Sequence, residues 1–149
     1  MLKQLCCSGT ASLYRRECSG NLEQLIATTP RTRAICNNPG VAGVHYTDQL
    51  QEACTEILRA GGFQLEEKAT VVVNILRGGL NFGLRNALAD AFGWNLHTTC
   101  FLSAQRARNE KDPDSWHITE NAYRKLYFPA ETSFVIGDVV ATGTSLRYA

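Results

Sequence analysis

The pattern of apolar residues predicts three buried strands in the second half of the chain. Residues 69–76 read ATVVVNIL, a continuous apolar run that is rich in β-branched side chains. Such runs are typical of strands that are covered on both faces, as the strands of parallel sheets are. Residues 95–104 and 133–138 are the next runs of this kind. We therefore expect all three to be core strands of one sheet.

Between the first two runs, apolar residues recur at the spacing of a helix. Leu84, Leu88 and Phe92 fall on one helical face, and Gly93 is expected to end the helix. A strand, a helix and a second strand in this order favour a parallel sheet with right-handed crossovers. The sequence thus predicts an α/β fold.

The first 68 residues predict an N-terminal helical region. Asn21 is a candidate N-cap with a glutamine three residues later, and the apolar positions that follow predict a helix over 21–29 that stops before a proline. Thr47 or Asp48 is expected to cap a second helix, which Gly61 ends.

Length and composition fit one domain with its own core. The chain has 149 residues, of which 44% are hydrophobic. We interpret residues 1–149 as a single domain, with the helical region over 1–68 and the core over 69–149. Lys and Arg number 15 and Asp and Glu 14, so no strong field is available to bind nucleic acid or an anionic membrane surface. Any anion site must be local.

The chain shows no sign of export or of membrane insertion. No apolar run is long enough to span a bilayer, and the N-terminus lacks the apolar core of a secretory signal. We therefore expect a soluble, cytoplasmic protein. The six cysteines include no CxxC pair, and we expect them to be reduced and mostly buried. No local signature pairs a Cys with a His as nucleophile and base, and no His/Cys spacing indicates zinc.

Two glycine-rich segments follow predicted strands. One is RGG at 77–79, after the first strand, and the other is DVVATGTS at 138–145, at the end of the third. Ligands of α/β sheets bind in the crevice at the carboxyl ends of the strands. If the two strands are neighbours, both segments face the same crevice. Neither segment matches a Walker loop, and no GxGxxG motif is present.

The residue types in these segments suit phosphate and sugar. Backbone N–H groups and the hydroxyls of Thr142, Thr144 and Ser145 can cradle a phosphate monoester where a helix begins. Asp138 can accept hydrogen bonds from a pair of sugar hydroxyls. In the first segment, two glycines allow the backbone to approach an anion closely, and the Arg77 guanidinium can donate two parallel hydrogen bonds to that anion. Each segment alone is also compatible with an ordinary turn, but their joint occurrence on consecutive strands favours a ligand site.

These two motifs resemble those of a known family, the type I phosphoribosyltransferases. FVIGDVVATGTSL resembles the family's phosphoribosyl-diphosphate motif, and VNILRGGL resembles its diphosphate-binding loop. The order of motifs over residues 71–146 also follows the family. The uracil-type members are the most similar, because ILRGGL, Arg106, YRKLYFP and ATGTS have counterparts there. Residues 1–70 carry no motif that can be aligned.

The resemblance implies a fold, an activity and a metal. The fold would be the parallel-sheet α/β fold of the family. The activity would be a glycosyltransferase reaction of nucleotide metabolism, in which phosphoribose passes from phosphoribosyl diphosphate to a nitrogenous base. Mg²⁺ would bind through the substrate, bridging the diphosphate and the ribose hydroxyls, without direct protein ligands. The partners would be small molecules, namely phosphoribosyl diphosphate and a base or nucleotide.

Residue roles carry over from the family by matching position. Asp138 would bind the ribose hydroxyls and act as a catalytic residue together with Arg106. The sugar's own phosphate would be held by Ala141, Thr142, Gly143, Thr144 and Ser145, and the diphosphate by Arg77, Gly78 and Gly79. Residues 105–125 resemble the family's mobile flap, which closes over the reacting groups. Positive charge from this flap would come from Arg106, Arg108 and Lys111, for which a solvated loop is the alternative interpretation.

Two departures from the family pattern leave alternatives open. Family members carry an acid where this chain has Gly137, and the family fold continues beyond the position of Ala149. We therefore expect a fold truncated after its third core strand: a fragment, a processed form or a protomer completed by a partner, with a homo-oligomer also compatible. The alternatives to an enzyme are a non-catalytic module that binds a nucleotide or phosphosugar, an interaction domain, and a plain structural fragment. The sequence does not identify the base.

Overall fold

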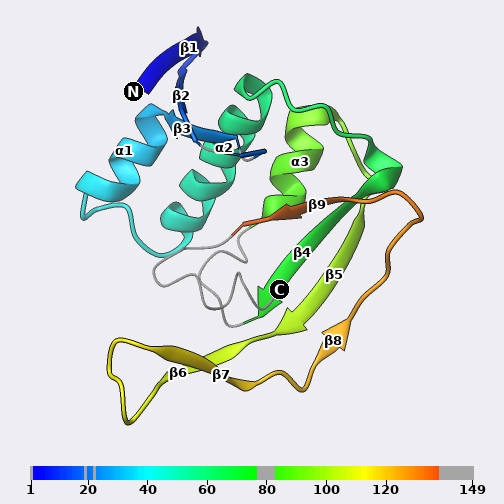
Figure 1. Ribbon diagram of the computed structural model, residues 1–149. Coiled ribbons are helices and arrows are strands. Elements are labelled where there is room, and N and C mark those ends of the chain that lie inside the picture. The colour runs from blue at the N-terminus through cyan, green and yellow to red at the C-terminus, as the bar shows by residue number, and fades with distance from the viewer. Residues whose placement is uncertain (1, 19, 22, 77–82, 138–149) are drawn as a thin grey trace. The chain divides into compact units, whose positions relative to one another are not determined.

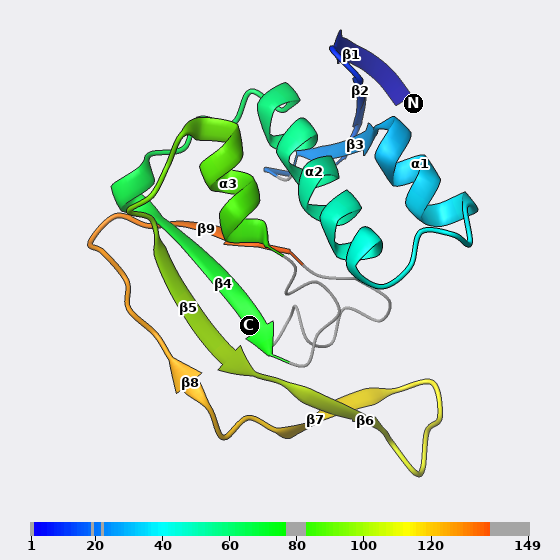
Figure 2. The ribbon, with the colours of Figure 1, turned by 180° about the vertical axis from the view of Figure 1, so that it is seen from behind.

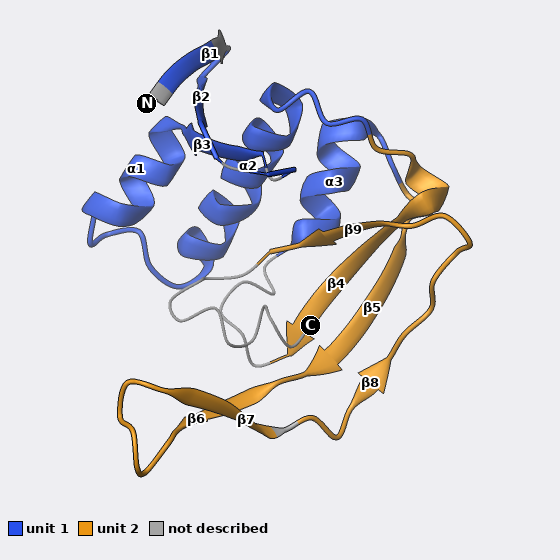
Figure 3. Cartoon of the chain, viewed as in Figure 1, with its two compact units in different colours: residues 1–64, 82–94 blue, residues 65–81, 95–149 orange. Residues whose placement is uncertain are grey.

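The computed structural model describes residues 2–18, 20–21, 23–76 and 83–137 (Figure 1). Contacts divide the chain into two compact units, coloured separately in Figure 3. Unit 1 comprises residues 1–64 and 82–94, and unit 2 comprises residues 65–81 and 95–149. The interpretation as a single domain stays a prediction.

Unit 1 begins with an antiparallel sheet of strand order β1-β2-β3. Its strands are β1 (Leu2–Ser8), β2 (Ala11–Arg16) and β3 (Gln24–Thr28). The turn between β1 and β2 contains Gly9 at φ 59°, a left-handed conformation that glycine adopts without steric cost. On β2, Ala11 and Leu13 are buried while the residues between and after them are more exposed, so this sheet has one covered face.

The predicted helix over 21–29 is wrong, because β3 occupies this segment. Ser12 pairs with Thr28 and Arg16 with Gln24 in the β2–β3 ladder. Along β3, Leu25 is partly buried and Ile26 is exposed, which is the alternation of a half-buried strand. Pairing with β2 thus prevails over a local capping signal that is weak by itself.

Three helices complete unit 1: α1 (Pro30–Asn37), α2 (Val44–Ala60) and α3 (Leu84–Phe92). The first starts at Pro30, directly behind Thr29, whose hydroxyl accepts a hydrogen bond from the Thr32 backbone N–H at 3.2 Å. The second starts earlier than predicted, after Gly43, and ends at Gly61 as expected. The third ends at Gly93 in the left-handed conformation, which confirms that prediction.

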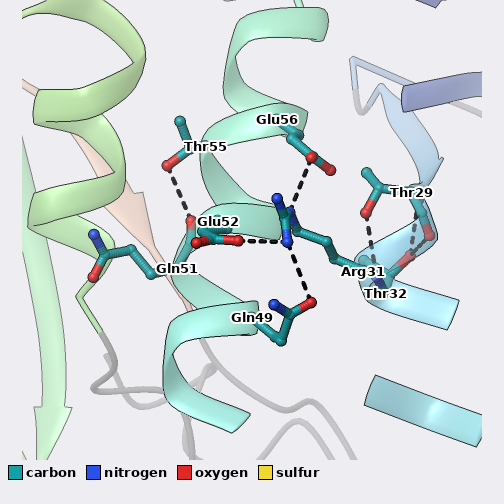
Figure 4. Close-up of polar contacts among 8 residues, drawn as sticks. All are labelled: Thr29, Arg31, Thr32, Gln49, Gln51, Glu52, Thr55 and Glu56. Atoms are coloured by element: carbon teal, nitrogen blue, oxygen red, sulfur yellow. Dashed lines mark hydrogen bonds and ion pairs between the residues drawn. The ribbon is translucent and has the colours of Figure 1, made fainter. Parts of the chain in front are cut away.

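The helix α2 packs against both other helices of unit 1. Figure 4 shows Arg31 of α1 reaching across to α2, where its Nε donates to Glu56 Oε1 at 3.1 Å and its Nη1 pairs with Glu52 Oε2 at 2.5 Å. Gln49 Oε1 lies 3.4 Å from the same Nη1. These contacts tie the two helices together through one guanidinium.

Unit 2 contains a four-stranded sheet of order β8-β5-β4-β9. Its strands are β4 (Thr70–Leu76), β5 (Thr98–Ser103), β8 (Arg124–Lys125) and β9 (Ser133–Ile136), and a short 3₁₀ turn, η1 (Glu67–Ala69), precedes β4. The pairs β4–β5 and β4–β9 are parallel, which confirms the three predicted strands and their parallel pairing. Since β8 joins β5 in the antiparallel direction, the sheet is mixed and the fold class is mixed α/β.

The core of unit 2 lies around β4. Val71 and Val72 are fully buried although they point to opposite faces, as predicted for a strand covered on both sides. The main apolar cluster comprises Val71, Val73, Ile75, Cys100, Leu102 and Ala104.

The cysteines are less buried than predicted. Among the four thiols whose side chains the structure describes, all are free. Cys100 is buried and Cys54 is partly buried, but Cys18 and Cys36 are exposed. Cys36 lies on α1, which buries none of its residues, so its helix offers no apolar surroundings for the thiol.

The predicted flap over 105–125 has two parts. A separate antiparallel hairpin pairs β6 (Gln105–Arg108) with β7 (Trp116–Glu120), and it continues directly from β5 (Figure 1). The end of the segment, β8, belongs instead to the main sheet. The segment is therefore regular β structure over much of its length, which the sequence did not predict, and its role as a mobile flap stays a prediction.

Candidate functional site

The carboxyl ends of β4, β5 and β9 lie at one edge of the main sheet. Leu76, the last residue of β4, pairs with Ser103, the last residue of β5. Ile136, the last residue of β9, pairs with Val73. Figure 2 shows from behind that β4 runs between these two neighbours. Because all three strands run in parallel, the chain leaves each of them on the same side.

Most predicted site residues lie outside the described residues. They are Arg77, Gly78, Gly79, Asp138, Ala141, Thr142, Gly143, Thr144 and Ser145. What the structure does give is their points of attachment, since Arg77 follows Leu76 directly and Asp138 stands two positions after Ile136. The condition set by the sequence, that the two glycine-rich segments follow neighbouring parallel strands, is met.

Arg106 and Arg108 lie together on the β6–β7 hairpin. The Cζ atom of Arg106 is 5.2 Å from the ring centroid of Trp116, and that of Arg108 is 5.3 Å from the same ring. Both distances are in the range of cation–π contacts. Trp116 lies within the predicted flap, but the sequence did not predict this contact, because the contact depends on the register of a hairpin that the sequence did not indicate.

The turn of the hairpin is held by side chains that accept from the backbone. Asn109 Oδ1 accepts from the Lys111 N–H at 3.1 Å, and Asp112 Oδ1 accepts from the Asp114 N–H at 3.2 Å. These local bonds fix the connection between the two strands. Lys111 is therefore in the turn, whereas the two arginines are on β6.

The segment that contains YRKLYFP is attached to the outer edge of β5. The Ser103 N–H donates to the Tyr123 carbonyl at 2.8 Å, and the Tyr123 N–H donates to Ser103 Oγ at 3.0 Å. Further along, the Tyr127 N–H donates to Cys100 Sγ at 3.1 Å, and that thiol lies 3.2 Å from the Tyr127 carbonyl oxygen. The motif that resembles the uracil-type members thus forms the edge of the main sheet.

One face of the main sheet carries an apolar hollow of about 290 Å³. The described residues that line it are Val73, Leu102, Arg124, Leu126, Phe128, Phe134 and Ile136. The rings of Phe128 and Phe134 meet edge to face with centroids 5.2 Å apart. Phe134 is nonetheless 53% exposed, so this face is only partly covered. None of these lining residues belongs to the predicted phosphate and sugar site.

Glu67 ties the start of β5 to the turn before β4. Its Oε1 accepts hydrogen bonds from the backbone N–H groups of Asn95 and Leu96. The bond from Leu96 is the main reason that the pKa of this carboxyl lies below its ordinary value, and the nearby His97 contributes to the same shift. This contact lies at the amino ends of the strands, opposite the predicted site.

The alternative chemistries find little support in the described part of the chain. Burial raises the pKa of the Cys54 thiol, which makes a thiolate nucleophile there less accessible. No group of three His, Cys, Asp or Glu side chains among the described residues is arranged to hold a metal ion.

Comparisons with known proteins add no family to this description. Searches of protein-family models, of curated proteins and of solved structures return no match. Of the helices that the structure describes, none combines the length and the apolar character that a membrane span requires. Function is therefore inferred from the strand geometry and the motifs.

Proposed function

We propose that this chain is a type I phosphoribosyltransferase-like domain that binds phosphoribosyl diphosphate and transfers its phosphoribose to a nitrogenous base. The observation that supports it is the meeting of three strand ends at one edge of the sheet. RGG follows β4, DVVATGTS follows its neighbour β9, and the hairpin with Arg106 follows β5. Three segments whose residue types suit phosphate and sugar thus start from one edge of the sheet, where ligands of α/β sheets commonly bind.

The proposed reaction breaks the bond between the anomeric carbon and the diphosphate oxygen. Positive charge develops on the sugar and negative charge on the departing diphosphate. Arg77 and the Gly78–Gly79 backbone would bind the diphosphate, Asp138 the ribose hydroxyls, and residues 141–145 the sugar's phosphate. Mg²⁺ bound through the substrate would supply further neutralisation of the diphosphate. Arg106, at the start of the hairpin, would add a cation on the side of β5.

Calorimetric titration with phosphoribosyl diphosphate and Mg²⁺ tests the proposal. We expect saturable binding, and we expect Asp138→Asn to weaken it about 10- to 100-fold, because a carboxylate that accepts from hydroxyls is replaced by a neutral amide. Asp48→Asn is the matched control, since Asp48 is an exposed acid on α2, away from all predicted site residues in the sequence, and it should bind as the wild type does. Absence of heat with a folded wild-type sample would contradict the proposal.

Gly137 favours a second candidate, a non-catalytic module that binds a phosphosugar or nucleotide. It stands where the resemblance predicts an acid beside Asp138, and it directly follows β9. The two candidates differ in turnover. An enzyme releases diphosphate when a set of purine and pyrimidine bases is added, and Asp138→Asn abolishes that release, whereas the module binds phosphoribosyl diphosphate and releases none.

A further inference from the structure

The β6–β7 hairpin presents two guanidinium groups beside one indole ring. We propose that Trp116 is a positioning residue that holds Arg106 and Arg108 on one face of the hairpin, so that both contact the diphosphate of the substrate. This inference rests on the proposed function, because it assigns the diphosphate as the anion. It concerns a side chain, Trp116, to which neither the motifs nor the resemblance gives a role.

The strand register places all three side chains on the same face. Arg108 pairs with Trp116, and Arg106 pairs with Ile118. Residues directly opposite each other in an antiparallel pair share a face, and residues two apart on one strand do as well. Trp116 therefore lies across from Arg108 and diagonal to Arg106. This geometry explains why one ring contacts both guanidinium groups.

Stacking on a ring uses the face of a guanidinium group and not its hydrogen-bonding edge. The ring contacts the face of the guanidinium, while the N–H donors lie in the guanidinium plane and can bind phosphate oxygens in pairs. Arg108 is exposed, and Arg106 and Trp116 are partly buried. Stacking limits the rotamers that each long side chain samples, so less freedom is lost when an anion binds. Each ring contact would contribute about a 2- to 5-fold increase in affinity.

The hairpin starts at the edge where the proposed substrate would bind. Only Ala104 separates the last residue of β5 from the first residue of β6. Ser103 pairs with Leu76, and Arg77 follows Leu76 directly. The two arginines are thus attached close to the segment that is proposed to bind the diphosphate.

The experiment uses Trp116 as its own reporter. The chain has two tryptophans, and Trp94, in unit 1, packs on Phe92 with ring centroids 4.9 Å apart. In a Trp94→Phe background, emission comes from Trp116 alone. Titration with inorganic pyrophosphate and Mg²⁺, and then with phosphoribosyl diphosphate, should change this emission in a saturable manner, because the stacked guanidinium groups move or become neutralised when the anion binds.

Variants separate positioning from a general structural role. Trp116→Leu should weaken pyrophosphate binding and raise the KM for phosphoribosyl diphosphate about 5- to 20-fold, with a smaller effect on kcat. Trp116→Phe, which keeps an aromatic face, should restore most of the affinity. Tyr46→Leu is the matched control, since Tyr46 is an exposed aromatic residue on α2, outside the hairpin, and it should leave the affinity unchanged.

The outcomes distinguish this inference from the proposed function. If the wild type binds neither pyrophosphate nor phosphoribosyl diphosphate, the proposed function fails. If the wild type binds both and Trp116→Leu binds them equally well, the positioning role is overturned and the proposed function stands. If Trp116→Leu does not fold, the Trp94→Phe protein decides the matter, because binding without any change in Trp116 emission also overturns the positioning role.

Discussion

At the scale of single residues, Glu67 shows how one side chain can organise a strand start. Its carboxylate accepts hydrogen bonds from two backbone N–H groups just before β5, and these bonds stabilise the ionised form of the carboxylate. The same contact accounts for its lowered pKa and for the way that the chain enters β5. The carboxylate is thus a structural group at the edge opposite the proposed site.

The pH dependence of stability should report this contact. The folded-state pKa of Glu67 is below its ordinary value near 4.5. The ionised carboxylate therefore contributes to the free energy of unfolding above pH 4.5, and this contribution is lost as the pH falls through the folded-state pKa. Glu67→Gln should therefore unfold at lower denaturant concentration than the wild type at neutral pH, and the difference should shrink in acid. Denaturant titrations at a series of pH values measure this. Glu66→Gln, at an exposed neighbouring position, is the control.

Residue types predicted where two strands of the candidate site end, but not the side-chain contacts near those ends. The strand ends that carry RGG and DVVATGTS could be placed because glycine and small hydroxyl residues directly follow a buried apolar run. The contact of Trp116 with two arginines could not be predicted, because it depends on a hairpin register that is set by the Asn109 and Asp112 turns. The sequence shows where the basic residues are, but it does not show which of their side chains lie on the same face of the hairpin.

At the scale of elements, Arg31 is the link between α1 and α2. Its guanidinium faces Glu52 and Glu56, which lie on one face of α2. The second carboxylate oxygen of Glu56, Oε2, is buried and makes no hydrogen bond within the described part of the chain. Removing the cation would therefore leave two carboxylates together without a partner charge.

Arg31→Met should lower the free energy of unfolding of the protein by about 1–3 kcal/mol, the range for lost hydrogen bonds to charged groups at a partly exposed site. Arg33→Met is a matched control two positions along α1. Arg33 is exposed and forms no ion pair among the described residues, so a change within about 0.5 kcal/mol is expected. Urea denaturation followed by circular dichroism measures both, and equal losses would contradict the assigned role of Arg31.

Elements with their own periodicity were predictable, and those that depend on a partner were not. The strand β4 and the helix α3 follow from continuous or helical apolar patterns and from Gly93 as a stop. In contrast, β3 forms because β2 pairs with it, and nothing in the sequence of residues 21–29 indicates that these residues have a strand partner. Pro30 was interpreted as a stop, although proline also suits the first turn of a helix, where no amide hydrogen bond is lost.

At the scale of the whole molecule, the main sheet of unit 2 leaves apolar surface exposed. Large side chains gather at the apolar hollow, and Phe128, Leu126 and Phe134 are 49%, 46% and 53% exposed. Parallel sheets are normally covered on both faces, so we expect an apolar molecule added in solution to bind at this exposed surface.

An apolar dye should detect this surface. We expect 1-anilinonaphthalene-8-sulfonate to gain fluorescence with the native protein. We expect Phe134→Thr to remove most of the gain, while the β-branched threonine remains compatible with strand β9. Leu96→Thr is the control, because Leu96 is 67% exposed but does not line the hollow. Titration of dye into folded samples measures the effect, and undiminished fluorescence in Phe134→Thr would place the dye elsewhere.

The thiol of Cys100 has a consequence for how the sheet edge opens. It lies fully buried between its own strand and the Tyr127 backbone, so a reagent reaches it only when the segment around β8 has peeled away. Cys18 and Cys36 are exposed in the folded protein, so we expect them to react with the same reagent without any opening of the structure. The rate at which Cys100 is alkylated, compared with the faster rate for these two cysteines, therefore measures how often the outer strand detaches locally.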